Sequence, residues 1–244
     1  LVAEDNRINS GLLLMLLEKL GYQATAVANG FEVLQAIEQL EYDVILMDIN
    51  MPKMDGLETT RQIVEIYPKD KRPKIIAISA SSLKEDVDAS YEAGVEDYLC
   101  KPIQLDDIQV ALSKGHDISQ YQVSVTASGV ARQGIVNSHV LGQYQEATVV
   151  KIAALFIRDM EQMLEKLPLA IKLEDADRLF DYCHSSKGVC LNLGAELLAS
   201  KLERLLVLLN KSDFAEMSHT LPDLKTCFDN TKIELQRILN AQEG

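Results

Sequence analysis

Two short segments of this 244-residue chain contain side chains that can carry a phosphoryl group. In the first segment, residues 47–56 (MDINMPKMDG), Asp48 directly follows an apolar run. In the second, residues 184–194 (HSSKGVCLNLG), His184 begins a helical pattern. A carboxylate and an imidazole can each form a covalent phosphoryl intermediate and pass it on. The pair therefore predicts a relay in which Asp48 and His184 exchange phosphate with partners or with each other.

The first half of the chain alternates short apolar runs with longer amphipathic ones, which predicts a parallel sheet with helices on both faces. Strands are expected at 1–3, 22–27, 43–47, 74–79 and 95–99, and helices at 8–20, 31–40, 57–66, 84–93 and 104–113. Ligands of such sheets collect at the carboxyl ends of the strands. We therefore expect the polar residues that follow the strands to lie at one edge: Glu4, Asp5, Asp48, Ser79 and Lys101.

The second half has no strand pattern. Its apolar residues recur at spacings of three to five, which predicts a helical bundle. The segment between the two halves is rich in Gly, Ser, Thr and Gln and has weak periodicity, as expected of a linker. The predicted fold class is thus an α/β domain over 1–114, a linker over 115–137 and an all-α four-helix bundle over 138–244.

The first domain resembles the receiver domain of two-component response regulators. The matching residues are the acidic cluster Glu4-Asp5-Asn6, the phosphoacceptor Asp48 in the segment quoted above, the switch residues Ser79 and Tyr98, and Lys101 followed by Pro102. The resemblance implies a flavodoxin-like fold of five parallel strands. It also implies that a kinase phosphohistidine donates its phosphoryl group to Asp48.

The same resemblance implies a Mg²⁺ site. Its ligands would be Glu4, Asp5, Asp48 and the main-chain carbonyl of Asn50, since Mg²⁺ prefers oxygen ligands. Positioning and charge neutralisation dominate phosphoryl transfer. Lys101 is accordingly expected to neutralise one phosphoryl oxygen, while the hydroxyl of Ser79 binds another. After transfer, the family's switch would move Ser79 inward and Tyr98 with it.

The second domain resembles histidine-containing phosphotransfer (HPt) domains, which are four-helix bundles that display one histidine. The matching pattern is His184-x-x-Lys187-Gly188, followed by residues 192–195 (NLGA). Residues three and four apart share a helix face, so Lys187 can approach a phosphate on His184. Gly188 costs about 1 kcal/mol of helix stability relative to alanine, which indicates that it leaves room for docking.

Composition excludes several other functions. The net charge is −13, and no basic stripe or zinc-finger spacing occurs, which disfavours nucleic-acid binding. No apolar run approaches the roughly 18 residues of a membrane helix, so we expect no membrane contact by this piece. The four cysteines lack a metal-binding spacing and are expected to be reduced core thiols in the cytoplasm. Because the chain opens within an apparent strand, we expect it to continue upstream, where a membrane anchor could lie.

The leading hypothesis is a receiver and HPt pair like the C-terminal part of a hybrid sensor histidine kinase. Its expected partners are a histidine kinase core, in the same full-length chain or in another, and a downstream receiver. No nucleotide-binding motif is present, so whether this piece alone counts as an enzyme stays open. One alternative is a non-catalytic module that binds or inhibits a kinase, and another, less favoured, is a DNA-binding regulator. Transfer within or between chains, and the packing of the two domains, also stay open.

Overall fold

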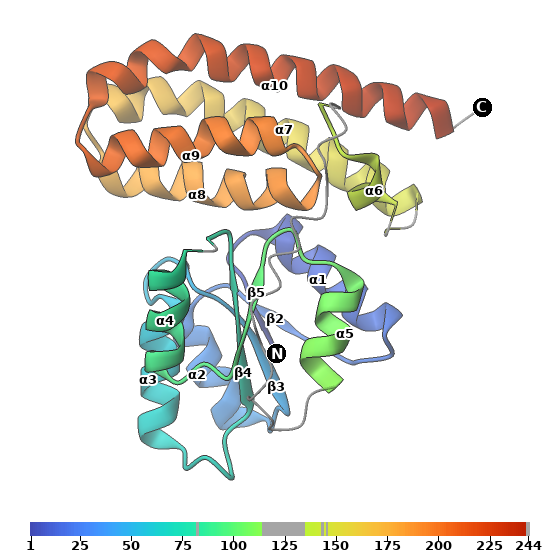
Figure 1. Ribbon diagram of the computed structural model, residues 1–244, viewed down its shortest axis with the longest axis vertical. Coiled ribbons are helices and arrows are strands. Elements are labelled where there is room, and N and C mark those ends of the chain that lie inside the picture. The colour runs from blue at the N-terminus through green and yellow to red at the C-terminus, as the bar shows by residue number, and fades with distance from the viewer. Residues whose placement is uncertain (82, 114–134, 143, 145, 243–244) are drawn as a thin grey trace.

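The computed structural model describes residues 1–81, 83–113, 135–142, 144 and 146–242. These residues form a sheet domain with helices on both faces and a bundle of long helices stacked against it (Figure 1). The predicted fold class is thereby confirmed. Most of the expected linker, residues 115–134, lies outside the described residues. No helix in the described ranges is both long and apolar enough to cross a membrane.

The sheet has five strands in the order β2-β1-β3-β4-β5, and every neighbouring pair is parallel. The strands are β1 (Val2–Ala3), β2 (Ala26–Val27), β3 (Val44–Asp48), β4 (Lys74–Ser79) and β5 (Asp97–Cys100). β3 and β4 are almost wholly buried, as central strands covered on both faces must be. β2 is shorter than the predicted strand over 22–27 because only two residues of β1 pair with it. β5 begins at Asp97, two residues later than predicted.

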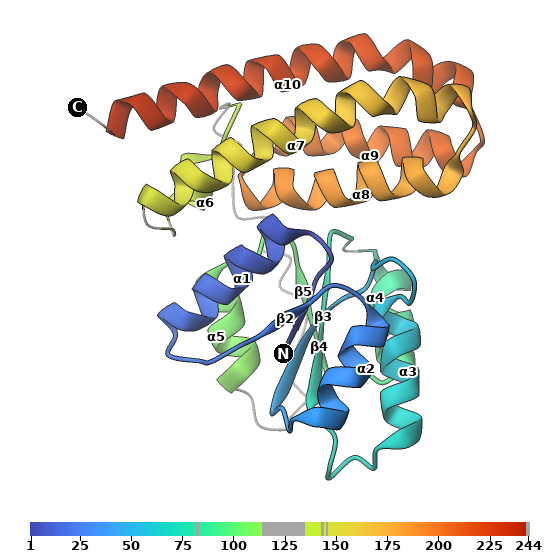
Figure 2. The same cartoon turned by 180° about the vertical axis from the view of Figure 1, so that it is seen from behind.

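Five helices cover the two faces of the sheet. α1 (Arg7–Lys19) and α5 (Leu105–Ser113) lie on one face, and α2 (Gly30–Gln39), α3 (Gly56–Ile66) and α4 (Lys84–Ala93) lie on the other (Figures 1 and 2). The first three helices of the chain begin after polar residues whose side chains accept hydrogen bonds from main-chain N–H groups of the first turn: Asn6, Asn29 and Asp55. Such caps satisfy N–H groups that have no partner within the helix, and so fix where it begins.

The bundle consists of four long helices and one short one. They are α6 (Ser138–Leu141), α7 (Glu146–Lys172), α8 (Ala176–Asn192), α9 (Glu196–Asn210) and α10 (Phe214–Gln242). Val136, just before α6, already packs in the bundle core, and the Asn137 N–H donates to the Gly194 carbonyl oxygen at 2.9 Å. Gly194 has φ 70°, and a Cβ there would lie 2.8 Å from the Asn137 carbonyl oxygen. Its position between α8 and α9 therefore requires glycine.

The expectation that the cysteines are reduced core thiols is met by three of the four. Cys183, Cys190 and Cys227 are free and buried in the bundle core. Cys100 is also free but exposed, so the expectation of a core thiol was wrong there. The reason is its place at the last position of β5, a strand at the edge of the sheet.

The two domains are packed against each other through α1. Its side chains Ile8 and Leu12 belong to the same buried apolar cluster as the bundle core, and Met15 packs against that cluster. α1 contacts both α7 and α8, and α8 lies on the side of the bundle that faces the sheet domain (Figures 1 and 2). The sequence left the domain packing open, and the structure gives a docked pair with a shared core.

Two leucines of α1 offer a matched test of this packing. Leu12 and Leu13 are each 2% exposed, but Leu12 packs in the apolar cluster of the bundle, whereas Leu13 packs in the cluster between the sheet and the helices α1 and α5. Replacing a buried leucine by alanine costs about 2–5 kcal/mol. We expect Leu12→Ala to separate the domains and raise the radius of gyration in small-angle X-ray scattering. Leu13→Ala should instead give the larger loss of thermal stability. An unchanged radius for Leu12→Ala would contradict the shared core.

Candidate functional site

The carboxyl ends of four strands bring the predicted polar residues of the sheet domain to one edge, which we call the acidic edge. Glu4 and Asp5 follow β1, Asp48 ends β3, Ser79 ends β4 and Lys101 follows β5. Four of the five are buried, and Asp5 is partly exposed. The order of the parallel strands thus assembles side chains that are nearly one hundred residues apart in the chain.

The loop after β3 folds back tightly over Asp48. A Cβ at Gly56 would lie 2.2 Å from the Asp48 carbonyl oxygen, so a larger residue could not occupy this position without displacing the loop. The Asp55 side chain accepts from the Glu58 N–H at 2.7 Å and caps α3. The Asn50 N–H donates to Asp48 Oδ1 at 3.0 Å. Asn50, expected to offer its carbonyl to a metal, therefore lies beside Asp48.

Lys101 is the electrostatic centre of the acidic edge. Its Nζ donates to Glu4 Oε2 at 2.8 Å and to Asp48 Oδ2 at 2.6 Å. All three side chains are at most 2% exposed. Buried charges are stable only when they are paired and hydrogen-bonded, so each of these groups depends on the other two. The peptide bond from Lys101 to Pro102 is cis.

Burial and neighbouring charges set the ionisation of these groups. Burial, reinforced by the charge of Asp48, raises the pKa of Glu4 above its usual range, although the paired ammonium of Lys101 opposes the shift and favours the carboxylate form. Burial and Asp48 likewise raise the pKa of Asp5 to about 6. Burial also acts to raise the pKa of Asp48, but Lys101 outweighs it and the pKa lies below its usual range. Asp48 and Glu4 keep the pKa of Lys101 high in spite of burial. Asp48 is therefore an ionised nucleophile at neutral pH.

The acidic edge fits a divalent cation. Glu4, Asp5 and Asp48 each offer a carboxylate oxygen, and these atoms all lie within 4.8 Å of one another. When all three are ionised, the single ammonium of Lys101 leaves two negative charges without compensation. Burial is the main cause of the raised pKa values of Glu4 and Asp5, and repulsion from Asp48 adds to it. A hard cation with oxygen ligands, such as Mg²⁺, would balance both charges.

The two predicted switch residues are linked through one loop residue. Ser79 is buried, and its Oγ accepts from the Ser81 N–H at 3.0 Å. The Tyr98 hydroxyl donates to the Ser81 carbonyl oxygen at 2.8 Å. Burial raises the pKa of Tyr98 to about 12, so the hydroxyl keeps its proton. A movement of Ser79 would therefore reach Tyr98 through the main chain of Ser81.

His184 lies on α8 and faces the acidic edge. The next residue, Ser185, accepts from the Asn6 side chain at 2.8 Å, and one turn later the Cβ position of Gly188 lies 3.6 Å from the Lys101 Nζ that binds Asp48. The turn of α8 that carries His184 is therefore packed against the edge that holds Asp48, and the charges of Asp48 and Lys101 both act on the imidazole. Phe180, one turn earlier, stacks on the imidazole with 5.3 Å between ring centroids and 13° between ring planes. Burial lowers the pKa of His184 to about 4, and Asp48 only partly opposes this. The ring is neutral at pH 7, which is its nucleophilic form.

Gly188 marks a close approach of α8 to the sheet domain. A Cβ at this position would lie 3.1 Å from Asn9 Nδ2 and 3.6 Å from Lys101 Nζ. The first distance is tighter than ordinary van der Waals contact, so a side chain here would force the Asn9 amide to move by a few tenths of an ångström. The position of Gly188 thus gives a physical reason for a glycine within a helix.

Lys187 has a partner other than His184. Its ammonium forms an ion pair with Glu203 of α9. Both charges act on the imidazole, Lys187 lowering the pKa of His184 and Glu203 raising it. The expected approach of Lys187 to a phosphate on His184 therefore involves an exchange of Glu203 for the phosphate.

The sequence did not predict the contacts that three asparagines make at the domain interface. Asn6 Nδ2 donates to Ser185 Oγ at 2.8 Å, and Asn192 Nδ2 donates to Asn9 Oδ1 at 3.0 Å. Two sequence signals point to them in retrospect. Asn9 stands on the buried face of α1 among apolar residues, and Asn192 follows His184 by two helical turns and so shares its face.

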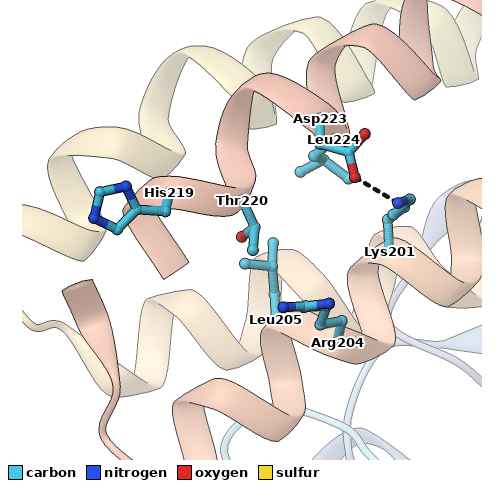
Figure 3. Close-up of a pocket in the computed structure, with 7 residues that line it drawn as sticks. All are labelled: Lys201, Arg204, Leu205, His219, Thr220, Asp223 and Leu224. Carbon is cyan, nitrogen blue, oxygen red and sulfur yellow. Dashed lines mark hydrogen bonds and ion pairs between the residues drawn. The ribbon is translucent and has the colours of Figure 1, made fainter. Parts of the chain in front are cut away.

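A separate hollow of about 170 Å³ lies between α9 and α10 (Figure 3). An ion pair between Lys201 and Asp223 lies at its wall. The lining residues come from α9 and α10 only, and include none of the predicted phosphate-site residues. The hollow therefore plays no part in the arrangement described above.

Comparison with known proteins gives two family matches in separate parts of the chain. The response regulator receiver domain matches residues 1–113, and the Hpt domain matches residues 151–241. The hybrid signal transduction protein dokA of Dictyostelium discoideum is 42% identical over 46% of this chain and 7% of its own length. The aerobic respiration control sensor protein ArcB of Escherichia coli K12 is 27% identical over 80% of this chain and 26% of its own length. The chain thus spans about a quarter or less of these curated relatives.

Among solved structures, the receiver domain of sensor histidine kinase PA1611 from Pseudomonas aeruginosa PAO1 is 37% identical to the chain. The match covers 46% of this chain and 90% of that one, with a TM-score of 0.42.

Gly188→Ala tests the close approach of α8. We expect the bundle to gain up to about 1 kcal/mol of stability from the better helix former, while the added methyl group displaces the Asn9 amide and loosens the packing of α8 on the sheet domain. The pKa of His184 should then rise from about 4 toward its ordinary value near 6.5, as measured by NMR titration. Gly11→Ala on α1 is the control, since nothing lies within 4 Å of its Cβ position. A His184 pKa that is unchanged in Gly188→Ala would contradict the steric account.

Acid is expected to weaken the docking of the two domains. Because the docked pKa of His184 is about 4 and the ordinary value is near 6.5, docking favours the neutral ring. This contribution is complete above about pH 6.5 and is lost as the pH falls toward 4. The scattering radius should therefore rise over this range. The radius of the His184→Gln protein should rise less on acidification, since only the carboxylates then contribute to the pH dependence of docking. Equal rises in the two proteins would refute the assignment to His184.

Proposed function

We propose that this chain carries phosphate from a histidine kinase to a further receiver. Its residues 1–113 belong to the response regulator receiver family, and its residues 151–241 belong to the Hpt family. Asp48 takes the phosphoryl group from a kinase phosphohistidine, His184 takes it from Asp48, and an aspartate of another receiver takes it from His184. The observation that supports this route best is the packing of the His184 turn of α8 against the edge that holds Asp48, through the contacts of Ser185 with Asn6 and of Gly188 with Lys101.

In the first step an Asp48 carboxylate oxygen attacks the phosphorus of the kinase phosphohistidine. The new P–O bond forms as the P–N bond breaks, and the kinase imidazole leaves. Lys101 neutralises one phosphoryl oxygen and the Ser79 hydroxyl donates to another, which matches a transition state whose charge is spread over the equatorial oxygens. Mg²⁺ held by Glu4, Asp5, Asp48 and the Asn50 carbonyl would supply further charge neutralisation.

In the second step a nitrogen lone pair of neutral His184 attacks the phosphorus on Asp48. The P–N bond forms as the P–O bond breaks, and Asp48 leaves as a carboxylate that Lys101 can bind again. Phe180 stacks on the imidazole and restricts its orientation, which favours an aligned attack. Lys187 lies near enough to neutralise the transferred phosphoryl group once it releases Glu203.

The proposed partners follow from the two ends of this route. A histidine kinase core supplies the phosphoryl group, in the same full-length protein or in a separate one, and a downstream receiver accepts it. After the first step, Ser79 and Tyr98 would report the phosphorylation of Asp48 through Ser81. The free, buried thiols of the bundle support a reducing compartment, and we propose the cytoplasm.

The second candidate function is a non-catalytic module that binds or inhibits a kinase. The paired charges argue against it, because a protein that only docks has no need to bury Lys101, Glu4 and Asp48 together at the cost of desolvating them.

A label-transfer experiment distinguishes these functions. When the chain is mixed with a radiolabelled, phosphorylated histidine kinase core and Mg²⁺, we expect base-labile label on Asp48 to appear first and acid-labile label on His184 to follow. Asp48→Asn should abolish loading of both sites, and His184→Gln should leave the label on Asp48. Label on His184 of the Asp48→Asn protein would refute the proposed order. No label on either residue of the wild-type chain would favour the non-catalytic module.

A further inference from the structure

Two asparagine side chains meet within the domain interface, one from each domain. Asn9 of α1 is 1% exposed and Asn192 of α8 is 4% exposed. Ile8 and Leu12, on either side of Asn9, pack in the shared apolar cluster. A polar group in such surroundings is costly unless it is hydrogen-bonded, so the partners of these two amides are informative.

The two amides form a chain of hydrogen bonds that ends on the acidic edge. Asn192 Nδ2 donates to Asn9 Oδ1 at 3.0 Å, and Asn9 Nδ2 donates to Glu4 Oε1 at 3.0 Å. The other Glu4 oxygen, Oε2, accepts from Lys101. One end of this chain therefore belongs to the bundle, and the other end is a carboxylate that fits Mg²⁺ in the sheet domain.

The direction of this chain depends on docking. A carboxylate oxygen accepts hydrogen bonds, so Asn9 must turn its NH₂ group toward Glu4 and its oxygen toward the bundle. Asn192 supplies the donor that this oxygen needs in the buried interface. When the bundle is absent, the Asn9 oxygen loses this partner and the amide is free to turn away from Glu4.

We propose that Asn9 and Asn192 are positioning residues that couple the docking of the Hpt domain to Mg²⁺ binding. Asn192 orients Asn9, Asn9 holds Oε1 of Glu4, and Oε2 is thereby kept toward Lys101 and Asp48. This inference rests on the proposed function, since it assigns Glu4 to the metal. Coupling between two binding events is reciprocal, so Mg²⁺ also favours docking to the same extent.

The coupling accounts for a requirement of the second step. Transfer from Asp48 to His184 needs the metal site and the docked bundle at the same time. If the two asparagines make Mg²⁺ binding and docking favour each other, they raise the population of the state in which Mg²⁺ is bound and the bundle is docked. Gly188, whose Cβ position lies 3.1 Å from Asn9 Nδ2, allows α8 to come near enough for this contact.

The test is a double-mutant cycle in the full chain, with Mg²⁺ alone as the titrant in calorimetry. We expect Asn192→Ala to raise the Mg²⁺ dissociation constant about five- to twenty-fold, in the lower part of the range of about 5- to 150-fold that is typical of coupling between sites, although residue 192 belongs to the other domain. Asn9→Ala should weaken Mg²⁺ binding by at least as much. In the Asn9→Ala background, Asn192→Ala should have no further effect, because the chain is already broken.

A matched control breaks a different hydrogen bond of the same interface. Ser185→Ala removes the contact with the Asn6 side chain and should change the Mg²⁺ dissociation constant less than about two-fold, well below the coupling range. Asn192→Ser serves as a second variant if Asn192→Ala does not fold. An effect of Asn192→Ala that persists in the Asn9→Ala background, or that Ser185→Ala reproduces, would overturn the proposal, as would an unchanged Mg²⁺ affinity.

The rate of transfer from Asp48 to His184 separates this inference from the proposed function. In a single turnover, Asn192→Ala should slow the transfer most at low Mg²⁺ and approach the wild-type rate at saturating Mg²⁺. A slowing that is the same at all Mg²⁺ concentrations contradicts the coupling. If the wild-type chain transfers no label to His184, the proposed function fails, while the Mg²⁺ titrations still decide whether the amide chain couples the two domains.

Discussion

The ion pairs of Lys101 with Glu4 and Asp48 are the interaction on which the phosphate site depends. They join the ends of β1, β3 and β5 at one buried point. Without the ammonium, buried carboxylates would face each other with no compensating charge, and Asp48 would lose the low pKa that keeps it ionised. The same ammonium lies near Gly188, so the bundle packs on the group that organises the acidic edge.

The residues that the bundle brings to the domain interface lie on one face of α8. Phe180, His184, Gly188 and Asn192 follow one another at intervals of four residues and therefore lie along a single stripe of the helix. Along this stripe, the ring of Phe180 stacks on the imidazole, Gly188 permits the close approach of α8 to the sheet domain, and the amide of Asn192 bonds to Asn9 of the other domain. A change in the register of α8 would move Gly188 and Asn192 away from Asn9 of α1 together.

Much of this arrangement could be predicted from the sequence, because parallel strands place their carboxyl ends together whatever the length of the connections. The gathering of Glu4, Asp48 and Lys101 at one edge follows from that rule. The docked interface could not be predicted, since Ile8 and Leu12 look like ordinary core residues of an amphipathic helix. The ion pair of Lys187 could not be predicted either, because its partner Glu203 lies on another helix and the contact depends on tertiary packing.

The shared apolar cluster around α1 and α8 has a consequence for the order of events in the relay. The side of α8 that presents His184 is covered by the chain's own sheet domain, so a second receiver cannot occupy that surface at the same time. In the proposed relay, delivery to a second receiver would therefore require the domains to separate, because this surface of α8 can bind one receiver domain at a time. Because the two domains share one chain, the tether favours return of the resident domain at an effective concentration of about millimolar order. An external acceptor must compete with that return.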